Sequence, residues 1–353
     1  MEKKITNTLN VSASIIEFWK SSRLQITDEF TVPPVILWID ESIIGTLGNF
    51  SASTGKAKSK KTFNICAIVA ASLINGTVLK YRAALPESKN KILYIDTEQS
   101  PYHCKKVLRR ILQLAELPTD KQPENLEFLS LRKFTPNIRL SIIETAIYLT
   151  EGLGLVIIDG IRDLAYDINS PSEATNLITK LMQWTDERQI HIHTVLHLNK
   201  GDDNTRGHLG TELNNKAETI LQVTKDDMEK DISSVSAMYI REKDFEPFAF
   251  RINDIGLLEL VENYQSRQLA KKTEFKYNEV SEAKHREALQ TLFTDAEAYT
   301  YDTLIKGLRQ SYGNVGYIFG VNKAKDLKMF LCNKRMVLQG EDKLYRYNPD
   351  FYY

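Results

Sequence analysis

The sequence has few cysteines, no long apolar run and no net charge. Its 353 residues contain only three cysteines, Cys66, Cys104 and Cys332, whose wide spacing fits neither a disulfide framework nor a metal-binding motif. No apolar run exceeds about ten residues, which is too short to cross a bilayer. The first ten residues also lack the apolar core of a signal peptide. We therefore expect a cytoplasmic protein that works in a reducing compartment.

Basic and acidic residues number 46 each, so the net charge indicates no class of partner. A content of 42% hydrophobic and 26% charged residues is ordinary for a folded protein with a sizeable core, and it excludes a mainly disordered chain. The sequence has no internal repeat and no low-complexity tract. Its length predicts two or three domains.

Strand and helix patterns alternate through the middle of the chain. The expected strands are short runs of apolar, β-branched and aromatic residues, at 35–39, 91–96, 126–131, 154–159 and 190–196. Helical patterns lie between them, at 63–74, 101–115, 138–150 and 172–187. Four short strand patterns then follow without helices between them, at 219–223, 234–241, 249–252 and 257–261. This order predicts an α/β fold with a parallel sheet flanked by helices and an antiparallel extension at one edge.

The patterns divide the chain into an N-terminal helical arm at 1–34, an α/β domain at 35–264, a polar linker at 265–279 and a C-terminal domain at 280–353. For the arm, a helix packed on the flank of the α/β domain is favoured over a partner-binding arm. The C-terminal domain has three helical patterns followed by a hairpin pattern, which is the order of a winged-helix module. Residues 80–90 are polar, and we expect a surface connection there.

The segment Gly55–Thr62 organises the α/β domain. It reads Gly55-Lys56-Ala57-Lys58-Ser59-Lys60-Lys61-Thr62, one residue away from the phosphate-loop pattern G-x-x-x-x-G-K-[ST]. Such a loop holds phosphates on its backbone N–H groups and on the N-terminus of the helix that follows. Lys61 would reach the β- and γ-phosphates of a nucleotide, and the Thr62 hydroxyl would hold Mg²⁺. The whole segment is therefore expected to bind nucleotide.

Lys60 stands where the pattern has its second glycine. A lysine adds bulk and charge at a place where the backbone must approach a phosphate closely. The four lysines of the loop could instead strengthen phosphate binding through their charge. We favour a loop that still supports hydrolysis over a site that only binds nucleotide.

Two carboxylates follow strands of the predicted sheet. Asp159 ends the apolar strand at 154–159, where it could complete the Mg²⁺ shell together with Thr62; the alternative is an aspartate that caps a turn. Gly160 comes next, so no neighbouring acid can activate water. Glu98 follows the strand at 91–96 and is the expected general base, although it could simply favour the dipole of the following helix.

His197 ends the next strand and precedes Asn199 and Lys200. A polar side chain there could sense the terminal phosphate and pass its state to the following loop at 201–210. His191 and His193 share a strand face with His197. A metal site is conceivable, but no acidic or cysteine partner has suitable spacing, and structural hydrogen bonds are favoured.

Residues 35 to 260 resemble RecA-like ATPases, in particular the RepA/DnaB-type branch of hexameric helicases found in mobile elements. The resemblance rests on GKAKSKKT (55–62), ILYIDTEQSP (92–101), GLVIIDG (154–160), TVLHLNK (194–200) and TRGHLGTEL (205–213). It implies ATP and Mg²⁺ as ligands, Glu98 as catalytic base, His197 as sensor, and a homo-oligomer that in this branch is a hexamer. That branch presents a K-x-R pair to the neighbouring subunit's nucleotide. Arg241-Glu242-Lys243 is similar in reversed order, and Arg206 is another candidate for this role.

A basic segment at 322–335 lies in the third helix of the C-terminal domain and just after it. It carries five basic residues and one acidic residue, a local charge of +4, and we expect Leu327, Met329, Phe330 and Leu331 to form its core stripe. The basic face could contact DNA phosphates; the alternatives are a solvated face or a protein-docking surface.

Together these features predict an ATP-hydrolysing protein that acts on DNA, as a helicase or as a helicase-like accessory factor in replication or mobilisation. Single-stranded DNA would bind the ATPase core, or duplex DNA the winged helix. Two other readings stay open. One is a DNA-binding regulator that no longer hydrolyses nucleotide, and the other is a loader or switch ATPase that works through protein contacts.

Overall fold

The structure is a computed structural model that describes residues 12–198, 205, 207–226, 229–262, 264, 275–317 and 319–351. The chain forms two compact units, Met1–Ser266 and Arg267–Tyr353. The division falls at the start of the predicted linker at 265–279. Within the described ranges, no helix combines the length and the apolar character needed to span a membrane.

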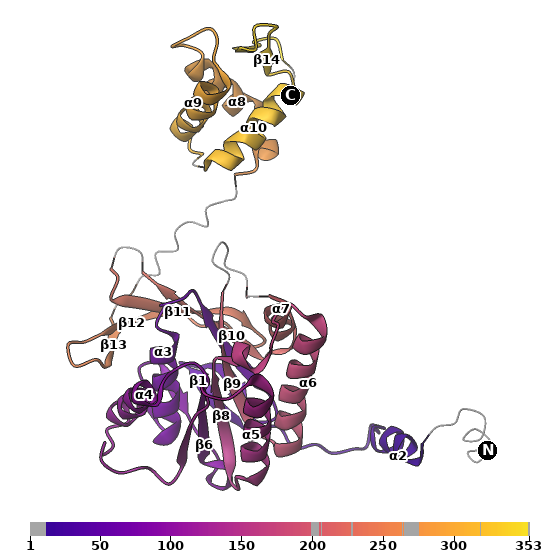
Figure 1. The fold of residues 1–353 in the computed structure, drawn as a ribbon, viewed down its shortest axis with the longest axis vertical. Coiled ribbons are helices and arrows are strands. Elements are labelled where there is room, and N and C mark those ends of the chain that lie inside the picture. The colour runs from indigo at the N-terminus through magenta and orange to yellow at the C-terminus, as the bar shows by residue number, and fades with distance from the viewer. Residues whose placement is uncertain are drawn as a thin grey trace. The chain divides into compact units, whose positions relative to one another are not determined.

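The larger unit is built on a nine-stranded sheet with the order β13-β12-β11-β10-β3-β9-β8-β6-β7 (Figure 1). Its strands are β3 (Phe50–Gly55), β6 (Lys91–Asp96), β7 (Leu126–Ser130), β8 (Leu153–Asp159), β9 (His191–His197), β10 (Thr219–Lys225), β11 (Ile232–Ile240), β12 (Phe248–Ile252) and β13 (Leu258–Val261). Neighbours from β10 to β7 pair in parallel, whereas β10 to β13 pair antiparallel. The predicted α/β sheet with an antiparallel edge is confirmed, although β10 itself lies parallel to β3.

Helices cover both faces of this sheet (Figure 1). They are α3 (Lys61–Leu73), α4 (Pro101–Leu114), α5 (Pro136–Leu149), α6 (Pro171–Arg188) and α7 (Gly207–Lys216). The cores of the two faces are separate: α3 and α4 pack on one, and α5, α6 and α7 pack on the other. The central strand β8 is buried along its whole length, as a strand covered on both faces requires.

Proline and serine fix where several of these helices begin. Proline occupies the first turn of α4, α5 and α6, where its missing N–H costs no hydrogen bond. Ser170 caps α6 by accepting a hydrogen bond from the backbone N–H of Glu173. Helix α7 was not predicted: its first residues fall in the expected loop at 201–210, and the rest has no strong helical pattern.

A second sheet of four short strands, with the order β2-β1-β5-β4, was missed in part by the sequence analysis. Its strands are β1 (Val35–Ile39), β2 (Ser42–Thr46), β4 (Thr77–Val78) and β5 (Tyr81–Ala83). The polar segment at 80–90 is therefore not only a surface connection. Tyr81 is fully buried, and its hydroxyl donates a hydrogen bond to Asn64 Oδ1 at 2.8 Å. With only three residues, β5 buries Tyr81 and Ala83 on one side, an alternation too short to indicate a strand.

The N-terminal arm contains the helix α2 (Ala13–Ser21), which buries none of its residues. The prediction that this helix packs on the flank of the α/β domain is wrong. Ile15, Phe18 and Trp19 are each more than half exposed, and the stretch after the helix exposes further large apolar side chains. Amphipathic spacing predicted the helix correctly but could not show whether its apolar face has a partner.

The smaller unit has three helices followed by a hairpin. Its elements are α8 (Glu282–Leu292), α9 (Tyr301–Asn314), α10 (Val321–Asn333), β14 (Val337–Gln339) and β15 (Tyr345–Tyr347), preceded by a short 3₁₀ turn at Tyr277–Glu279. Tyr299, between α8 and α9, forms a bridge to Tyr345 in the hairpin. The predicted core stripe is wrong at one position: Leu327 and Leu331 are buried, but Met329 is 56% exposed.

Candidate active site

The phosphate loop joins β3 to α3 at the carboxyl ends of the parallel strands. Gly55 is required there because a Cβ atom would lie 2.3 Å from the carbonyl oxygen of Val223 on β10. Lys60 immediately precedes α3 and has a left-handed backbone, with φ of 68°. This conformation explains why the family pattern has glycine at that place.

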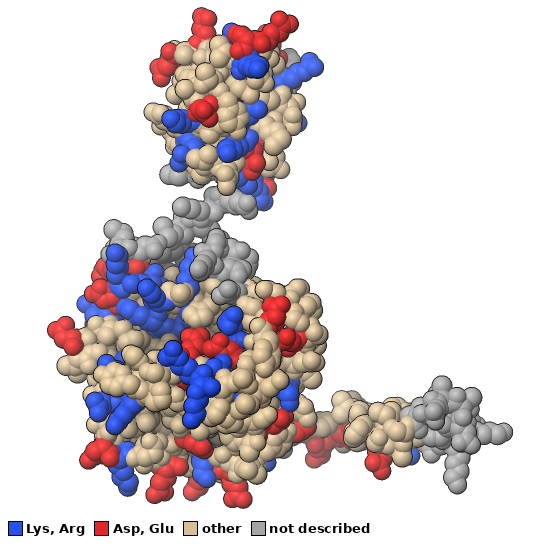
Figure 2. Space-filling model, viewed as in Figure 1, with Lys and Arg blue, Asp and Glu red and all other residues tan. Residues whose placement is uncertain are grey.

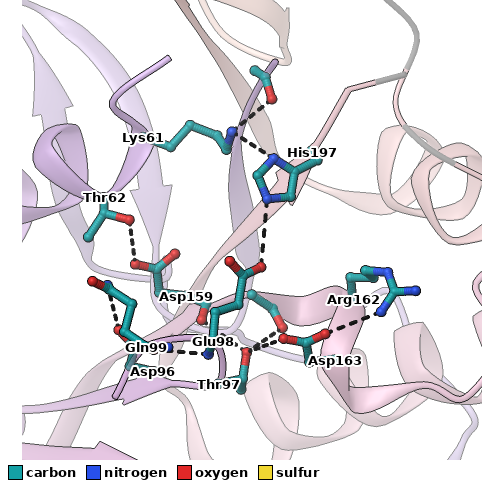
Figure 3. A network of polar contacts seen from close by, with 12 residues as sticks. Lys61, Thr62, Asp96, Thr97, Glu98, Gln99, Asp159, Arg162, Asp163 and His197 are labelled. Atoms are coloured by element: carbon teal, nitrogen blue, oxygen red, sulfur yellow. Dashed lines mark hydrogen bonds and ion pairs between the residues drawn. The ribbon is translucent and has the colours of Figure 1, made fainter. Parts of the chain in front are cut away.

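Lys61 folds back over the loop and is only 5% exposed. Its ammonium donates hydrogen bonds to the carbonyl oxygens of Gly55 at 2.8 Å and Lys56 at 3.0 Å, and to His197 Nδ1 at 3.0 Å (Figure 3). A lysine ammonium has three donors, so all of them are used. Burial lowers the pKa of Lys61 to about 8, although Asp159 and Glu98 act in the opposite direction.

Thr62 and Asp159 lie together beneath the loop (Figure 3). The Thr62 hydroxyl donates a hydrogen bond to Asp159 Oδ2 at 2.9 Å, and Tyr94 on β6 donates to the same oxygen at 2.9 Å. Burial, reinforced by the nearby carboxylate of Asp96, raises the pKa of Asp159 to about 6. Asp159 is therefore ionised at neutral pH, and its oxygens together with the Thr62 hydroxyl form the hard oxygen donor set that Mg²⁺ prefers.

Glu98 faces His197 across the site (Figure 3). Their nearest atoms, Glu98 Oε1 and His197 Nε2, are 3.6 Å apart. Because His197 Nδ1 accepts a hydrogen bond from Lys61, the neutral imidazole carries its proton on Nε2, directed at Glu98. The contact with His197 lowers the pKa of Glu98, so the carboxylate is ionised and able to accept a proton. Lys61, His197 and Glu98 thus form one continuous polar chain.

The turn after β6 holds Glu98 in this place. Asp96 accepts hydrogen bonds from the backbone N–H groups of Glu98 at 3.0 Å and Gln99 at 2.7 Å. The Thr97 hydroxyl lies within hydrogen-bond distance of the carbonyl oxygen of Gly160 at 2.9 Å. These contacts tie the Glu98 turn to the strand end that carries Asp159.

A cleft of about 440 Å³ opens at this site. Besides the predicted residues, it is lined by side chains that sequence reasoning missed, chiefly Phe63, Gln99, His103, Lys106, Arg110 and Arg162. The guanidinium of Arg110 lies over the ring of Phe63, 3.7 Å from its centroid. Basic side chains gather over this region on the face shown in Figure 2, with carboxylates beside them. Such a polar cleft with a basic rim suits a polyanion.

Three residues that sequence reasoning missed lie within three residues of a strand-end aspartate, and this position is a signal that could have found them: Gln99 and Arg162, which line the cleft, and Tyr94, which contacts Asp159. The pairing of Arg110 with Phe63 depends on how α4 packs against α3, and no sequence pattern reports it.

Arg241 and Lys243 do not reach this cleft. They follow β11, which runs antiparallel to β10, so they lie at the edge of the sheet opposite the phosphate loop. Arg241 donates a hydrogen bond to the carbonyl oxygen of Lys216 at 3.1 Å. Arg206, Asn199 and Lys200 lie outside the described residues.

His191 and His193 have structural partners. Ser51 Oγ lies 2.7 Å from His191 Nε2 and 2.7 Å from His193 Nδ1, and Ser53 Oγ lies 2.9 Å from His193 Nε2. Burial lowers the pKa of both histidines, that of His193 to about 3, so both are neutral. Across the described ranges, no cluster of His, Cys, Asp and Glu side chains could hold a metal ion on its own.

Comparison with known proteins agrees with this geometry. Residues 19–203, more than half of the chain, match the sequence profile of a family described as AAA domain. The chain belongs to this AAA domain family. Among solved structures, the AAA domain protein is similar to the RadB recombinase, with 16% sequence identity, a TM-score of 0.43, and coverage of 61% of this chain and 92% of that chain. No curated protein matches the sequence.

The matched residues of the AAA domain include the phosphate loop, Glu98, Asp159 and His197. The AAA domain family and the helix-flanked parallel sheet confirm the predicted α/β fold with its phosphate loop. The smaller unit, Arg267–Tyr353, lies beyond the matched residues.

Proposed function

We propose that this protein binds Mg²⁺ and ATP at Gly55–Thr62 and hydrolyses the ATP, with Glu98 as the general base. The observation that carries the proposal is the chain of contacts from Lys61 through His197 to Glu98, which links a phosphate-binding lysine to an ionised carboxylate. An ionised carboxylate at the mouth of a polar cleft is the group that proton removal from water needs.

The side chains of the loop fit a nucleotide and its metal. Among the described residues, the buried hydroxyl of Ser59 has no hydrogen-bond partner, and Ser59 lines the cleft from the phosphate loop. Buried polar atoms are normally paired, so this hydroxyl fits a ligand that completes it. Thr62 and Asp159 would hold Mg²⁺, which when bound offsets the charge that develops on the phosphate oxygens.

With nucleotide bound, Lys61 and His197 would have distinct roles. All three donors of Lys61 are engaged, so it must release one acceptor before it can contact a phosphate oxygen. Release of His197 Nδ1 would free the imidazole to turn, and its movement would alter the surroundings of Glu98. His197 is therefore the proposed sensor of the terminal phosphate. Phosphate release from ATP, measured with Mg²⁺ and then with Mg²⁺ chelated, tests this function.

The rate should depend on pH in a bell shape. Asp159 gains a proton below its pKa of about 6, which removes the charge that holds Mg²⁺, and Lys61 loses its proton above its pKa of about 8. We expect kcat/KM for ATP to fall roughly tenfold per pH unit outside these limits. Steady-state kinetics from pH 5 to pH 9 measure it. A Lys61→Arg protein with residual activity should lack the alkaline decline, since a guanidinium stays charged; a decline unchanged in that variant would contradict the assignment.

We propose further that the protein is a homo-oligomer of the RepA/DnaB type, a hexamer in that branch, in which Arg241 or Lys243 completes a neighbour's site. The position of both residues away from their own cleft supports a role in trans. A cation supplied from a neighbour would stabilise the charge that develops on phosphate. Activity as a helicase, or as a helicase-like factor in replication or mobilisation, is the finer form of this proposal.

The smaller unit is the proposed duplex-binding module, a winged helix whose third helix would be α10. Lys325 lies on its exposed face, while Lys328 instead packs with its ammonium 4.9 Å from the centroid of the Tyr345 ring. A reversal of Lys328 would therefore disturb the fold as well as DNA binding. A loader that acts through protein contacts is the competing function, and the exposed apolar side chains of α2 favour it.

Lys325→Glu should weaken duplex binding about tenfold and lower the slope of log affinity against log salt by about one, because one phosphate contact is lost. Fluorescence anisotropy with labelled duplex DNA over a salt series measures both quantities. Lys284→Glu on α8 is the control, because it makes the same change of charge at a lysine that pairs with Glu287. Equal binding by Lys325→Glu and wild type would favour the loader.

A further inference from the structure

Lys60 occupies a backbone conformation that a lysine adopts at a cost. Its φ is 68° and its ψ is 32°, in the left-handed region where glycine has no steric penalty. Unfavourable backbone conformations persist only where the surrounding contacts hold them in place. Glycine would serve the loop's shape better, so the lysine side chain must contribute something that glycine cannot.

That side chain leaves the loop and reaches the β10–β11 turn. Its ammonium donates a hydrogen bond to the carbonyl oxygen of Asp231, the residue that immediately precedes β11. The ammonium is partly buried there, close to Lys225 at the end of β10. Burial and the charge of Lys225 lower the pKa of Lys60, while Asp231 acts in the opposite direction. The contact is therefore a charge-assisted bond within a partly desolvated corner.

The same hairpin also touches the beginning of the phosphate loop. Residues 220–222 of β10 pair in parallel with residues 52–54 of β3, and the carbonyl oxygen of Val223 fills the space that a side chain on Gly55 would need. The loop is thus connected to the β10–β11 hairpin at both ends, by the pairing of β3 with β10 up to Thr54 and by the side chain of Lys60. Only the second connection, through Lys60, depends on a residue that departs from the phosphate-loop pattern.

We propose that Lys60 is a positioning residue that joins the end of the phosphate loop to the β10–β11 hairpin, so that nucleotide in the loop stiffens the hairpin. This inference rests on the proposed nucleotide binding. Strand β11 extends from this contact to Ile240, immediately before Arg241, and it pairs with β10 on one side and β12 on the other. A conformational change in the phosphate loop can therefore reach Arg241 and Lys243 along β11, which is paired with a strand on each side.

Hydrogen–deuterium exchange of the full chain, with and without Mg²⁺ and a non-hydrolysable ATP analogue, tests the proposal. In the wild type, saturating analogue should slow exchange of the amides at 229–240 about tenfold. Lys60→Met and Lys60→Gly should lose this protection at saturation, and Lys60→Arg, which keeps a charged donor, should restore most of it. Lys60→Gly should unfold at the same or a higher temperature, because glycine relieves the left-handed backbone, so lost protection would not reflect a damaged fold.

Lys105→Met is the control, since Lys105 is exposed on α4, outside the phosphate loop and its cleft. It removes one positive charge and should keep the protection of 229–240. Protection in Lys60→Met and Lys60→Gly equal to that of the wild type would overturn the proposal. A wild type that binds no nucleotide at all would instead overturn the proposed function, so the two failures are distinguishable.

Discussion

The Glu98→Gln protein is expected to bind Mg²⁺ and ATP as the wild type does and to hydrolyse ATP about 100- to 10,000-fold more slowly, the range in which a general base contributes. Glutamine keeps the size of the side chain but cannot accept a proton. The proximity of His197 keeps Glu98 ionised, so its proton-accepting form is the populated one at neutral pH. Single-turnover phosphate release and equilibrium binding of a fluorescent ATP analogue separate the two quantities.

Two further variants make this result specific. Glu127→Gln on the edge strand β7 makes the same chemical change at an exposed glutamate outside the cleft and should leave turnover unchanged. His197→Asn should slow turnover by about tenfold while ATP still binds, since it removes a group that positions Glu98 without removing the base. Equal turnover by Glu98→Gln and wild type would reject the enzyme and leave the non-hydrolysing DNA-binding regulator as the better account.

The sequence could predict those site residues that lie at the ends of parallel strands. Glu98, Asp159 and His197 each follow a strand of the parallel sheet, and parallel strands bring their carboxyl ends to one edge. Their closeness to the phosphate loop therefore follows from the alternation of strand and helix. The sheet itself was predictable for a related reason, because β6 and β8 are mostly apolar runs and strand patterns alternate with helical ones.

The unpredicted part depends on packing between segments that are distant in sequence. The hydrogen bond of Lys61 to His197 spans 136 residues, and no local pattern shows that Lys61 would fold back instead of pointing outward. The link from Lys60 to Asp231 spans 171 residues and would look like a defect in the motif to any reading of the loop alone. The prediction that α2 packs against the α/β domain was wrong for a different reason. Amphipathic spacing predicts an apolar face but does not show whether anything covers that face.

Lys61→Met should reduce ATP affinity by about 100-fold or more, the scale expected when one partner of a buried charged contact is removed. The same variant should unfold at an equal or higher temperature. Burial lowers the pKa of Lys61 from 10.5 to about 8, so the folded protein disfavours the charged form by an amount on the order of 3 kcal/mol. That cost is fully present below pH 8, where the lysine is charged in both states, and it vanishes above pH 10.5.

Weaker ATP binding together with an equal or higher unfolding temperature would identify Lys61 as a residue that serves binding. Replacement of a purely structural lysine would instead lower the stability of the protein. Calorimetric titration with the ATP analogue and thermal unfolding at pH 7 measure the two effects. Lys105→Met, at an exposed position on α4 outside the cleft, is the control and should change affinity less than about threefold, as surface charges do. A Lys61→Met protein that binds ATP as tightly as the wild type would show that the loop does not hold phosphate through this lysine. The unpaired hydroxyl of Ser59 would then need another ligand.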